Sequence, residues 1–190
     1  RWYAVTTLPI NARTLLEKID KRSRTKLRKA IKLGVEIVKD DTQNPDNFYQ
    51  IAKENYNRPI DYYKKLIENN SDCEIYLARI NSEKYVNNSK ILYEKEIDKN
   101  EKLKRIINER QINGKNIKKS LNQKMESDKI INSYKEHLIN STQMLRDFPR
   151  GKVVAYCIVI KHGKNVSIFE DGYMKEHGNT APISLLRWKV

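Results

Sequence analysis

Two short segments of this chain hold residue types that could bind or transform a charged substrate. In the first, Arg58 stands directly before Pro59, which favours the start of a helix, where free backbone N–H groups already attract anions. Tyr62 follows Arg58 by four residues, so the two side chains should share one helix face. We expect Arg58 to bind a phosphate with Tyr62 beside it; the alternative is a surface arginine next to a core tyrosine.

The second segment, residues 166–188, predicts a strand, a turn at Asp171 and Gly172, a loop, and a helix that begins at Pro182. Asp171 is the most interesting carboxylate of the chain, with an ordinary loop role as its alternative. No residue is a convincing general base, so the sequence leaves the catalytic group unknown.

Familiar motifs of nucleotide-binding and metal-dependent enzymes are absent from the sequence. There is no G-x-x-x-x-G-K-[ST] loop and no G-x-G-x-x-G. The three histidines lack metal-ligand spacing and are expected to be exposed, while Cys73 and Cys157 lie in predicted strands as small buried hydrophobes. We therefore predict no metal and no cofactor. No signal peptide and no run of about 18 apolar residues is present, so we expect no segment to cross a membrane. No disulfide framework is evident, so we expect a cytoplasmic protein.

The positive charge of the chain is concentrated before the middle of the sequence. The net charge is +14, and residues 1–34 hold ten Lys or Arg against two acidic residues. Four members of this cluster are candidates for binding tRNA or another anion: Arg24, Lys26, Arg28 and Lys29. A solvated helix face is the alternative.

Periodicity and turn residues predict alternating strands and helices. Strands are expected at residues 2–8, 35–38, 73–80 and 153–160, and helices at 12–19, 24–33, after Pro45 and after Pro59. Ser23 should cap the second helix, and Gly34 should end it. The apolar stripe of that helix is predicted to comprise Leu27, Ala30 and Ile31.

A long polar stretch, residues 82–148, separates the strands expected at residues 73–80 and 153–160. Its break at Asn113 and Gly114 predicts two antiparallel helices, and the sequence shows heptad spacing at Val86, Tyr93, Asn100, Ile107, Ile117, Lys124, Ile131, Leu138 and Leu145. We call residues 82–148 the arm and expect a coiled coil inserted into the sheet. Such an insertion adds little to a core, so we expect it to contact another molecule; dimerisation is the alternative.

In the order and spacing of these segments the chain resembles the Fem family of non-ribosomal, aminoacyl-tRNA-dependent peptidyltransferases. Members of this family build peptidoglycan cross-bridges. The resemblance rests on the basic helix ending at Gly34, the Arg-Pro-x-x-Tyr-Tyr stretch at Arg58, and the strand-Gly-loop-helix segment ending at Trp188. The arm also lies where cross-bridge members carry theirs. The resemblance implies an α/β (α+β) fold, namely a GNAT-like mixed-sheet domain at residues 1–81 and 149–190, interrupted by the arm at 82–148. It further implies a preceding GNAT-like domain and a missing domain end, so these residues alone should be inactive.

The resemblance also implies a reaction and its partners. The protein should move an amino acid from aminoacyl-tRNA to the stem peptide or bridge of a lipid-linked or UDP-linked muramyl peptide precursor, at the inner face of the membrane. The implied substrate-binding residues are Arg58, Tyr62, Phe169, Asp171 and Gly172, with Arg58 on the precursor phosphate. Phe169 stands where relatives often have tyrosine, so this chain lacks that hydroxyl.

Two other function classes stay open from the sequence. The first is a non-catalytic basic module that binds RNA or protein through the arm. The second is a structural dimer joined by the arm, which predicts that deleting the arm abolishes self-association. Acetyl transfer is disfavoured because the sequence has no Gln/Arg-x-x-Gly-x-Gly/Ala loop for acyl-CoA.

Overall fold

The computed structural model describes residues 17–190. The strand expected at residues 2–8, and most of the helix expected at 12–19, lie outside these residues. Within them the helices are α2 (Lys21–Lys32), α3 (Tyr49–Tyr56), α4 (Ile60–Glu68), α5 (Ser82–Ile112), α6 (Lys118–Asp147) and α7 (Pro182–Lys189), with short 3₁₀ segments η1 (Pro45–Asn47) and η2 (Lys175–Thr180). The strands are β1 (Val35–Lys39), β2 (Cys73–Ile80), β3 (Lys152–His162) and β4 (Asn165–Tyr173).

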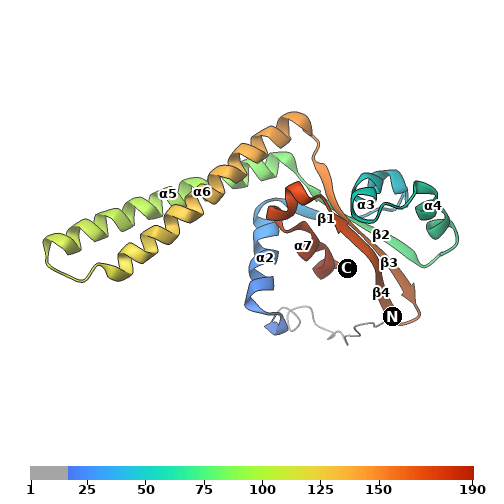
Figure 1. The fold of residues 1–190 in the computed structure, drawn as a ribbon, viewed down its shortest axis with the longest axis horizontal. Helices are drawn as coiled ribbons and strands as arrows, with labels where there is room; N and C mark the ends of the chain where they lie inside the picture. Colours follow the sequence, from blue (N-terminus) through green and yellow to red (C-terminus); the bar gives the residue numbers. More distant parts are fainter. Residues whose placement is uncertain (1–16) are drawn as a thin grey trace. The chain divides into compact units, whose positions relative to one another are not determined.

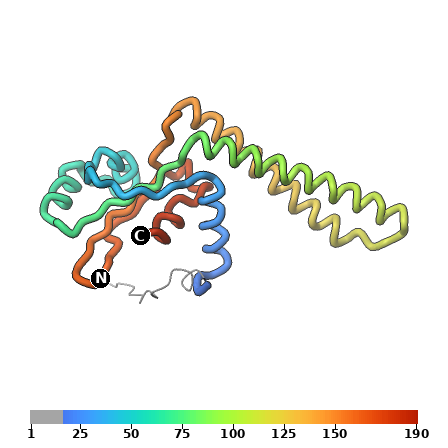
Figure 2. Tube along the Cα trace, turned by 180° about the vertical axis from the view of Figure 1, so that it is seen from behind, coloured from blue at the N-terminus to red at the C-terminus, as the bar shows by residue number. Residues whose placement is uncertain are grey.

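The four strands form one sheet in the order β1-β2-β3-β4, with β3 and β4 antiparallel. Helices α3 and α4 lie on one side of this sheet, and α2 packs against α7 on the other (Figures 1 and 2). The core between them is aromatic and aliphatic, with Phe48, Ile51, Tyr63, Tyr156 and Leu186 each at most 2% exposed. The α/β class predicted from the sequence is therefore confirmed.

The basic helix α2 differs from its prediction at both its start and its apolar face. It begins at Lys21, and the Asp20 carboxylate accepts the Ser23 backbone N–H at 2.9 Å, so Asp20 and not Ser23 provides the capping oxygen. Leu27 and Ala30 are buried as expected, but Ile31 is 59% exposed and does not belong to the stripe.

Glycine and proline mark the ends of elements as the sequence predicts. Gly34 has φ +79°, a left-handed conformation that ends α2 and leads into β1. Pro182 stands in the first turn of α7, where its missing N–H is not needed. Before α3 the prediction was too simple, because Pro45 opens a 3₁₀ turn and the α-helix itself begins at Tyr49.

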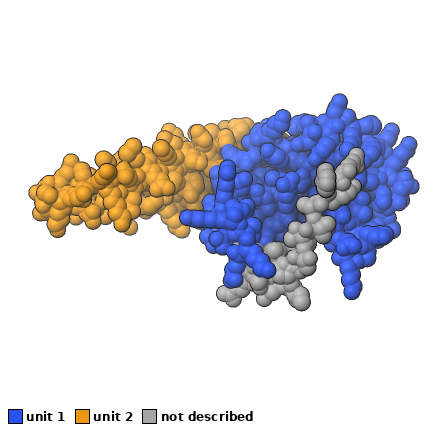
Figure 3. All heavy atoms as spheres, turned by 60° about the horizontal axis from the view of Figure 1, so that its bottom comes forward, with its two compact units in different colours: residues 1–32, 37–78, 154–190 blue, residues 33–36, 79–153 orange. Residues whose placement is uncertain are grey.

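Contacts divide the described residues into two units (Figure 3): residues 17–32, 37–78 and 154–190 in one, and residues 33–36 and 79–153 in the other. The second unit contains the arm, built from α5 and α6. The turn between these helices includes Gly114 at φ +62°. At the start of α5, the Asn81 side chain accepts the Lys84 N–H at 3.0 Å.

The residues buried between α5 and α6 are mostly small or polar. Serine occupies five of these buried positions, namely Ser82, Ser89, Ser120, Ser127 and Ser141. Asn100 and Ile107 of the predicted heptad are also buried, whereas Leu121 is 42% exposed. Small side chains allow two helix backbones to approach closely, so the buried serines permit close packing of α5 against α6.

Hydrogen bonds also join α5 to α6 along this seam. Asn100 Nδ2 donates to Asp128 Oδ1 at 2.8 Å, and Ser127 Oγ donates to Glu96 Oε1 at 2.7 Å. His137 is 1% exposed, with its Nδ1 2.9 Å from the Tyr85 hydroxyl, so the expectation that it is exposed was wrong. Among residues 17–190 no helix has the length and apolar character needed to cross a membrane.

Candidate functional site

A buried carboxylate, Glu170, lies at the centre of the best-defined polar cluster of the first unit. Its side chain is 2% exposed. Oε1 accepts hydrogen bonds from the hydroxyls of Tyr63 at 2.8 Å and Tyr156 at 2.6 Å, and Oε2 accepts one from Arg58 Nη1 at 2.5 Å. The sequence analysis did not single out Glu170, although its place beside Phe169 and Asp171 was a signal that could have drawn attention to it.

Helix α4, strand β3 and an irregularity in β4 bring these groups together. Ile158 pairs with Glu170, but its neighbour Val159 pairs with Ile168, so Phe169 is an extra, unpaired residue that forms a β-bulge. Bulges change the direction of side chains and are common beside functional sites. Here the bulge comes directly before the strand residue that faces the two tyrosines.

Aromatic packing fixes the two tyrosines. The Phe48 ring stacks on the Tyr156 ring with centroids 4.7 Å apart and meets Tyr63 edge-on at 5.5 Å. Burial, followed by the hydrogen bond to Glu170, raises the pKa of both phenols, so both remain protonated donors at neutral pH. Tyr63 is fully buried, and its polar role was not predicted from the sequence.

Arg58 reaches from this buried carboxylate toward the surface. Its side chain is 38% exposed. Its guanidinium carbon lies 4.6 Å from the centre of the Tyr62 ring and 5.5 Å from that of Tyr56. The predicted juxtaposition of Arg58 and Tyr62 is present, and Pro59 is the capping residue of α4. Asp61 also stands in the first turn of α4, where its carboxylate competes with an external anion for the free N–H groups.

Asp171 and Gly172 do not form the predicted turn. Both lie within β4, paired with Cys157 and Tyr156 respectively, so this prediction was wrong. Strand β3 extends beside these two residues and offers hydrogen-bond partners, so β4 continues through Asp171 and Gly172 and does not turn there. The Asp171 carboxylate binds Arg187 of α7 through two hydrogen bonds, one of them 2.9 Å long from Nη2.

The two remaining predicted site residues, Gly172 and Phe169, differ in exposure, and Tyr56 of α3 also contacts β4. The Tyr56 hydroxyl donates to the Asp171 carbonyl at 2.8 Å, which links the end of α3 to β4. Gly172 is buried against Tyr156 and Asn55, where a side chain would not fit. Phe169 is 43% exposed. Thus Arg58 and Tyr62 lie on the α4 side of the sheet with Glu170, whereas the Asp171 side chain binds α7 on the other side.

The basic helix forms a separate surface from Arg58, because α2 and α4 lie on opposite sides of the sheet (Figure 1). Lys26 and Arg28 are exposed, whereas Arg24 and Lys29 are half-buried. Partial burial lowers the pKa of Lys29. Nothing in the structure tests whether these four residues bind an anion, which stays a prediction.

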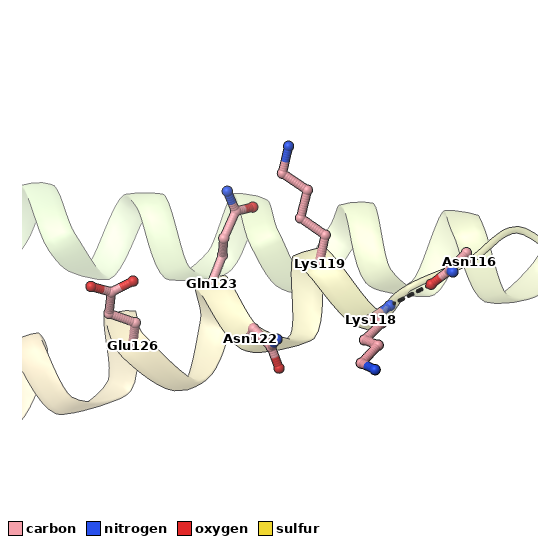
Figure 4. Close-up of a pocket in the computed structure, with 6 residues that line it drawn as sticks. All are labelled: Asn116, Lys118, Lys119, Asn122, Gln123 and Glu126. Carbon is pink, nitrogen blue, oxygen red and sulfur yellow. Dashed lines mark hydrogen bonds between the residues drawn. The ribbon is translucent and has the colours of Figure 1, made fainter.

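The arm carries its positive charge at the turn between its helices. Residues 102–119 hold seven Lys or Arg and one carboxylate, a net +6, whereas the rest of the arm sums to −1. We call residues 102–119 the arm tip. Two shallow surface hollows border it, one lined by Ile106, Glu109, Arg110, Asn113 and Lys115, the other by Asn116, Lys118, Lys119, Asn122, Gln123 and Glu126. Figure 4 shows Lys119 and Gln123 extending to one side of α6, with the Asn116 side chain accepting the Lys118 N–H at 2.9 Å.

Residues 17–190 hold no group of three or more His, Cys, Asp or Glu residues that could bind a metal ion. Cys73 and Cys157 are buried and unbonded, and burial raises the pKa of the Cys157 thiol to about 12, which makes it unreactive. The predicted strand positions of both cysteines are confirmed.

Comparisons with known proteins agree with the resemblance in the sequence. The chain matches the model of the FemAB family over residues 1–190. Its fold is similar to the crystal structure of FemX, with a TM-score of 0.60 and 16% sequence identity. That similarity covers 94% of this chain and 46% of FemX, so the chain spans about half the length of that relative. No curated protein matches it.

Proposed function

The chain belongs to the FemAB family, and we propose that it forms part of an aminoacyltransferase that extends the peptide of a peptidoglycan precursor. The match over residues 1–190 is the observation that carries this proposal. The free amino group of the precursor, which is the acceptor, would attack the ester carbonyl of aminoacyl-tRNA, the donor. A carbon–nitrogen bond forms, the ester carbon–oxygen bond breaks, and the tRNA ribose hydroxyl leaves with a proton.

The geometry supports Arg58 as a ligand of the precursor phosphate. Guanidinium groups bind phosphate through paired N–H donors, and Arg58 has five such donors, of which Glu170 receives one. Its side chain is partly exposed, and the rings of Tyr56 and Tyr62 restrict its motion. Positioning of two anionic substrates contributes to the rate in such a reaction, even where no general base is assigned.

Transfer of a radiolabelled amino acid from charged tRNA to UDP-linked or lipid-linked muramyl pentapeptide tests the proposal, with the full-length polypeptide. The variant Arg58→Ala should raise the KM for the precursor about 10- to 100-fold, since a charged hydrogen bond is lost. Lys65→Ala is the matched control, because Lys65 is an exposed cation on the same helix. Equal activity of wild type and both variants would contradict the role of Arg58.

The arm tip supports tRNA as the second substrate. A dense cluster of lysine and arginine attracts a phosphate backbone and makes binding salt-dependent. Charge reversal by Lys118→Glu and Lys119→Glu should weaken tRNA binding and reduce the slope of log K against log salt by about 2. Lys129→Glu and Lys135→Glu are the controls, because they change two exposed lysines of the same helix outside the tip.

The same measurements separate this proposal from its alternatives. A non-catalytic RNA-binding module would bind tRNA tightly but transfer no amino acid from any charged tRNA. A dimer joined by the arm would lose self-association, and not tRNA affinity, when the arm is deleted. Equal loss of tRNA binding in the tip pair and in the control pair would refute the tip as the contact site.

A further inference from the structure

Glu170 is a buried charged group to which the proposed reaction assigns no part. Both of its oxygens already accept hydrogen bonds, two at Oε1 from tyrosine hydroxyls and one at Oε2 from Arg58. A carboxylate bound in this way, with 2% of its side chain exposed, has no path to a substrate proton. Its role must therefore act through the groups that it binds.

Stability alone is a weak reason to keep a charge at this position. Removing a carboxylate from water is costly, and buried ion pairs can often be replaced by packed apolar side chains without loss of stability. The rings of Tyr63 and Tyr156 pack on Phe48, so these surroundings would suit apolar side chains if Glu170 and its hydroxyl partners were replaced together. The charge of Glu170 therefore has another explanation, and its contact with Arg58 indicates which.

Glu170 holds the guanidinium of Arg58 at a fixed place on the surface. The carboxylate binds one nitrogen, and the rings of Tyr62 and Tyr56 lie 4.6 and 5.5 Å from the guanidinium carbon. With Glu170 buried and Arg58 38% exposed, the pair is a dipole whose positive end is nearer to solvent. The unused N–H donors are then available to an anion without the entropy cost of ordering a free arginine.

Three elements of the fold fix the position of the Glu170 carboxylate beside Arg58. The bulge at Phe169 precedes it, and Tyr63 and Tyr156 come from α4 and β3, so three elements fix one carboxylate. From this geometry we propose that Glu170 is a positioning residue that presents Arg58 to a diphosphate-linked substrate, an inference that rests on the proposed function. The diphosphate is common to nucleotide-linked and lipid-linked precursors, so both are tested.

A double-mutant cycle in the full-length polypeptide provides the test. Glu170→Gln, which keeps the shape of the side chain, should raise the KM for the precursor about 10-fold with little change in kcat, because one charged contact is misplaced. In an Arg58→Ala background the same substitution should have no further effect on KM. Additive effects, or a lower melting temperature without a change in KM, would overturn the proposal. UDP-linked and lipid-linked precursors, assayed separately, show which source is bound.

A second variant keeps the proposal testable if Glu170→Gln does not fold. Tyr63→Phe removes one donor to Oε1 and leaves Arg58 untouched, so it should raise KM in the same direction by a smaller factor. An unchanged KM in this variant would count against positioning. Calorimetry of UDP-linked precursor binding separates the positioning role of Glu170 from the proposed aminoacyl transfer. Suppose that wild type binds the precursor, that Glu170→Gln binds it about 10-fold more weakly, and that neither protein transfers an amino acid. The positioning role then stands, and the proposed aminoacyl transfer fails.

Discussion

Gly172 provides the sharpest test of how tightly the Glu170 cluster is packed. A methyl group added at Gly172 would lie 2.8 Å from Tyr156 Cε1 and 3.2 Å from the Asn55 side-chain amide. Tyr156 cannot move cheaply, because its hydroxyl binds Glu170 at 2.6 Å and its ring stacks on Phe48. The cost of Gly172→Ala should therefore be that of overpacking a core, about 1–3 kcal/mol in the free energy of unfolding.

Chemical and thermal denaturation measure this cost. For a chain of this size, a loss of 1–3 kcal/mol corresponds to a fall in melting temperature of roughly 2–12 °C. The matched control is Gly178→Ala, whose added methyl would lie 3.2 Å from the Cε2 atom of Tyr173. Tyr173 is 36% exposed and its ring can turn toward solvent, so this substitution should stay within about 0.5 kcal/mol of wild type.

Coupling to Tyr156 identifies the source of the cost. Tyr156→Phe removes the hydrogen bond to Glu170, which frees the ring to move away from an added methyl. The cost of Gly172→Ala should therefore be smaller in the Tyr156→Phe background than in wild type. If Gly172→Ala and Gly178→Ala proved equally stable, the ring of Tyr156 would be mobile, and the argument that Glu170 is rigidly held would fail.

Two further substitutions test the arm and the sheet. Ser127→Leu should destabilise the α5–α6 pair by about 1–3 kcal/mol, because Ser127 is fully buried. Asn132→Leu, on the exposed side of α6, is the control and should not destabilise the pair. The loss of helical circular dichroism on heating measures both variants. Hydrogen bonds from Lys161 and Lys39 lower the pKa of Glu74 to about 2, so the stability they confer is present above the ordinary value of 4.5 and is lost as the pH falls toward 2. Glu74→Gln should therefore flatten the acid side of the stability–pH curve, and an unchanged curve would contradict this assignment.

Local signals in the sequence were sufficient to predict most elements of the fold. Gly34, Pro59 and Pro182 act through their own backbone constraints, which do not depend on distant residues, and the ends of α2, α4 and α7 follow from them. The predicted turn at Asp171 and Gly172 failed because pairing with β3 overrides the turn preference of the dipeptide. The prediction that Ile31 belongs to the buried stripe of α2 was wrong for a related reason. Helical spacing places a residue near such a stripe but does not decide how wide the buried face is.

The candidate site was predicted only where its residues are neighbours in the sequence. Arg58 and Tyr62 are one helical turn apart, and the structure brings their side chains together as expected. Glu170 is 112 residues from Arg58 and 107 from Tyr63, so no local pattern connects it to them. Its burial depends on a bulge whose register is set by the pairing of two strands, which periodicity alone does not reveal.

A lysine-rich composition does not by itself explain where the positive charge of the arm lies. If lysine-rich usage alone supplied the charge, it would be spread along the helices in proportion to length. Instead residues 102–119 carry +6, while the 49 other residues of the arm carry −1. In the rest of the arm, lysines are balanced by carboxylates, as in the pairs of Lys99 with Glu96 and Lys124 with Asp128. Charge that is balanced over most of each helix, and unbalanced around the turn and the helix ends that meet there, is the distribution expected of a surface that binds a polyanion at the tip.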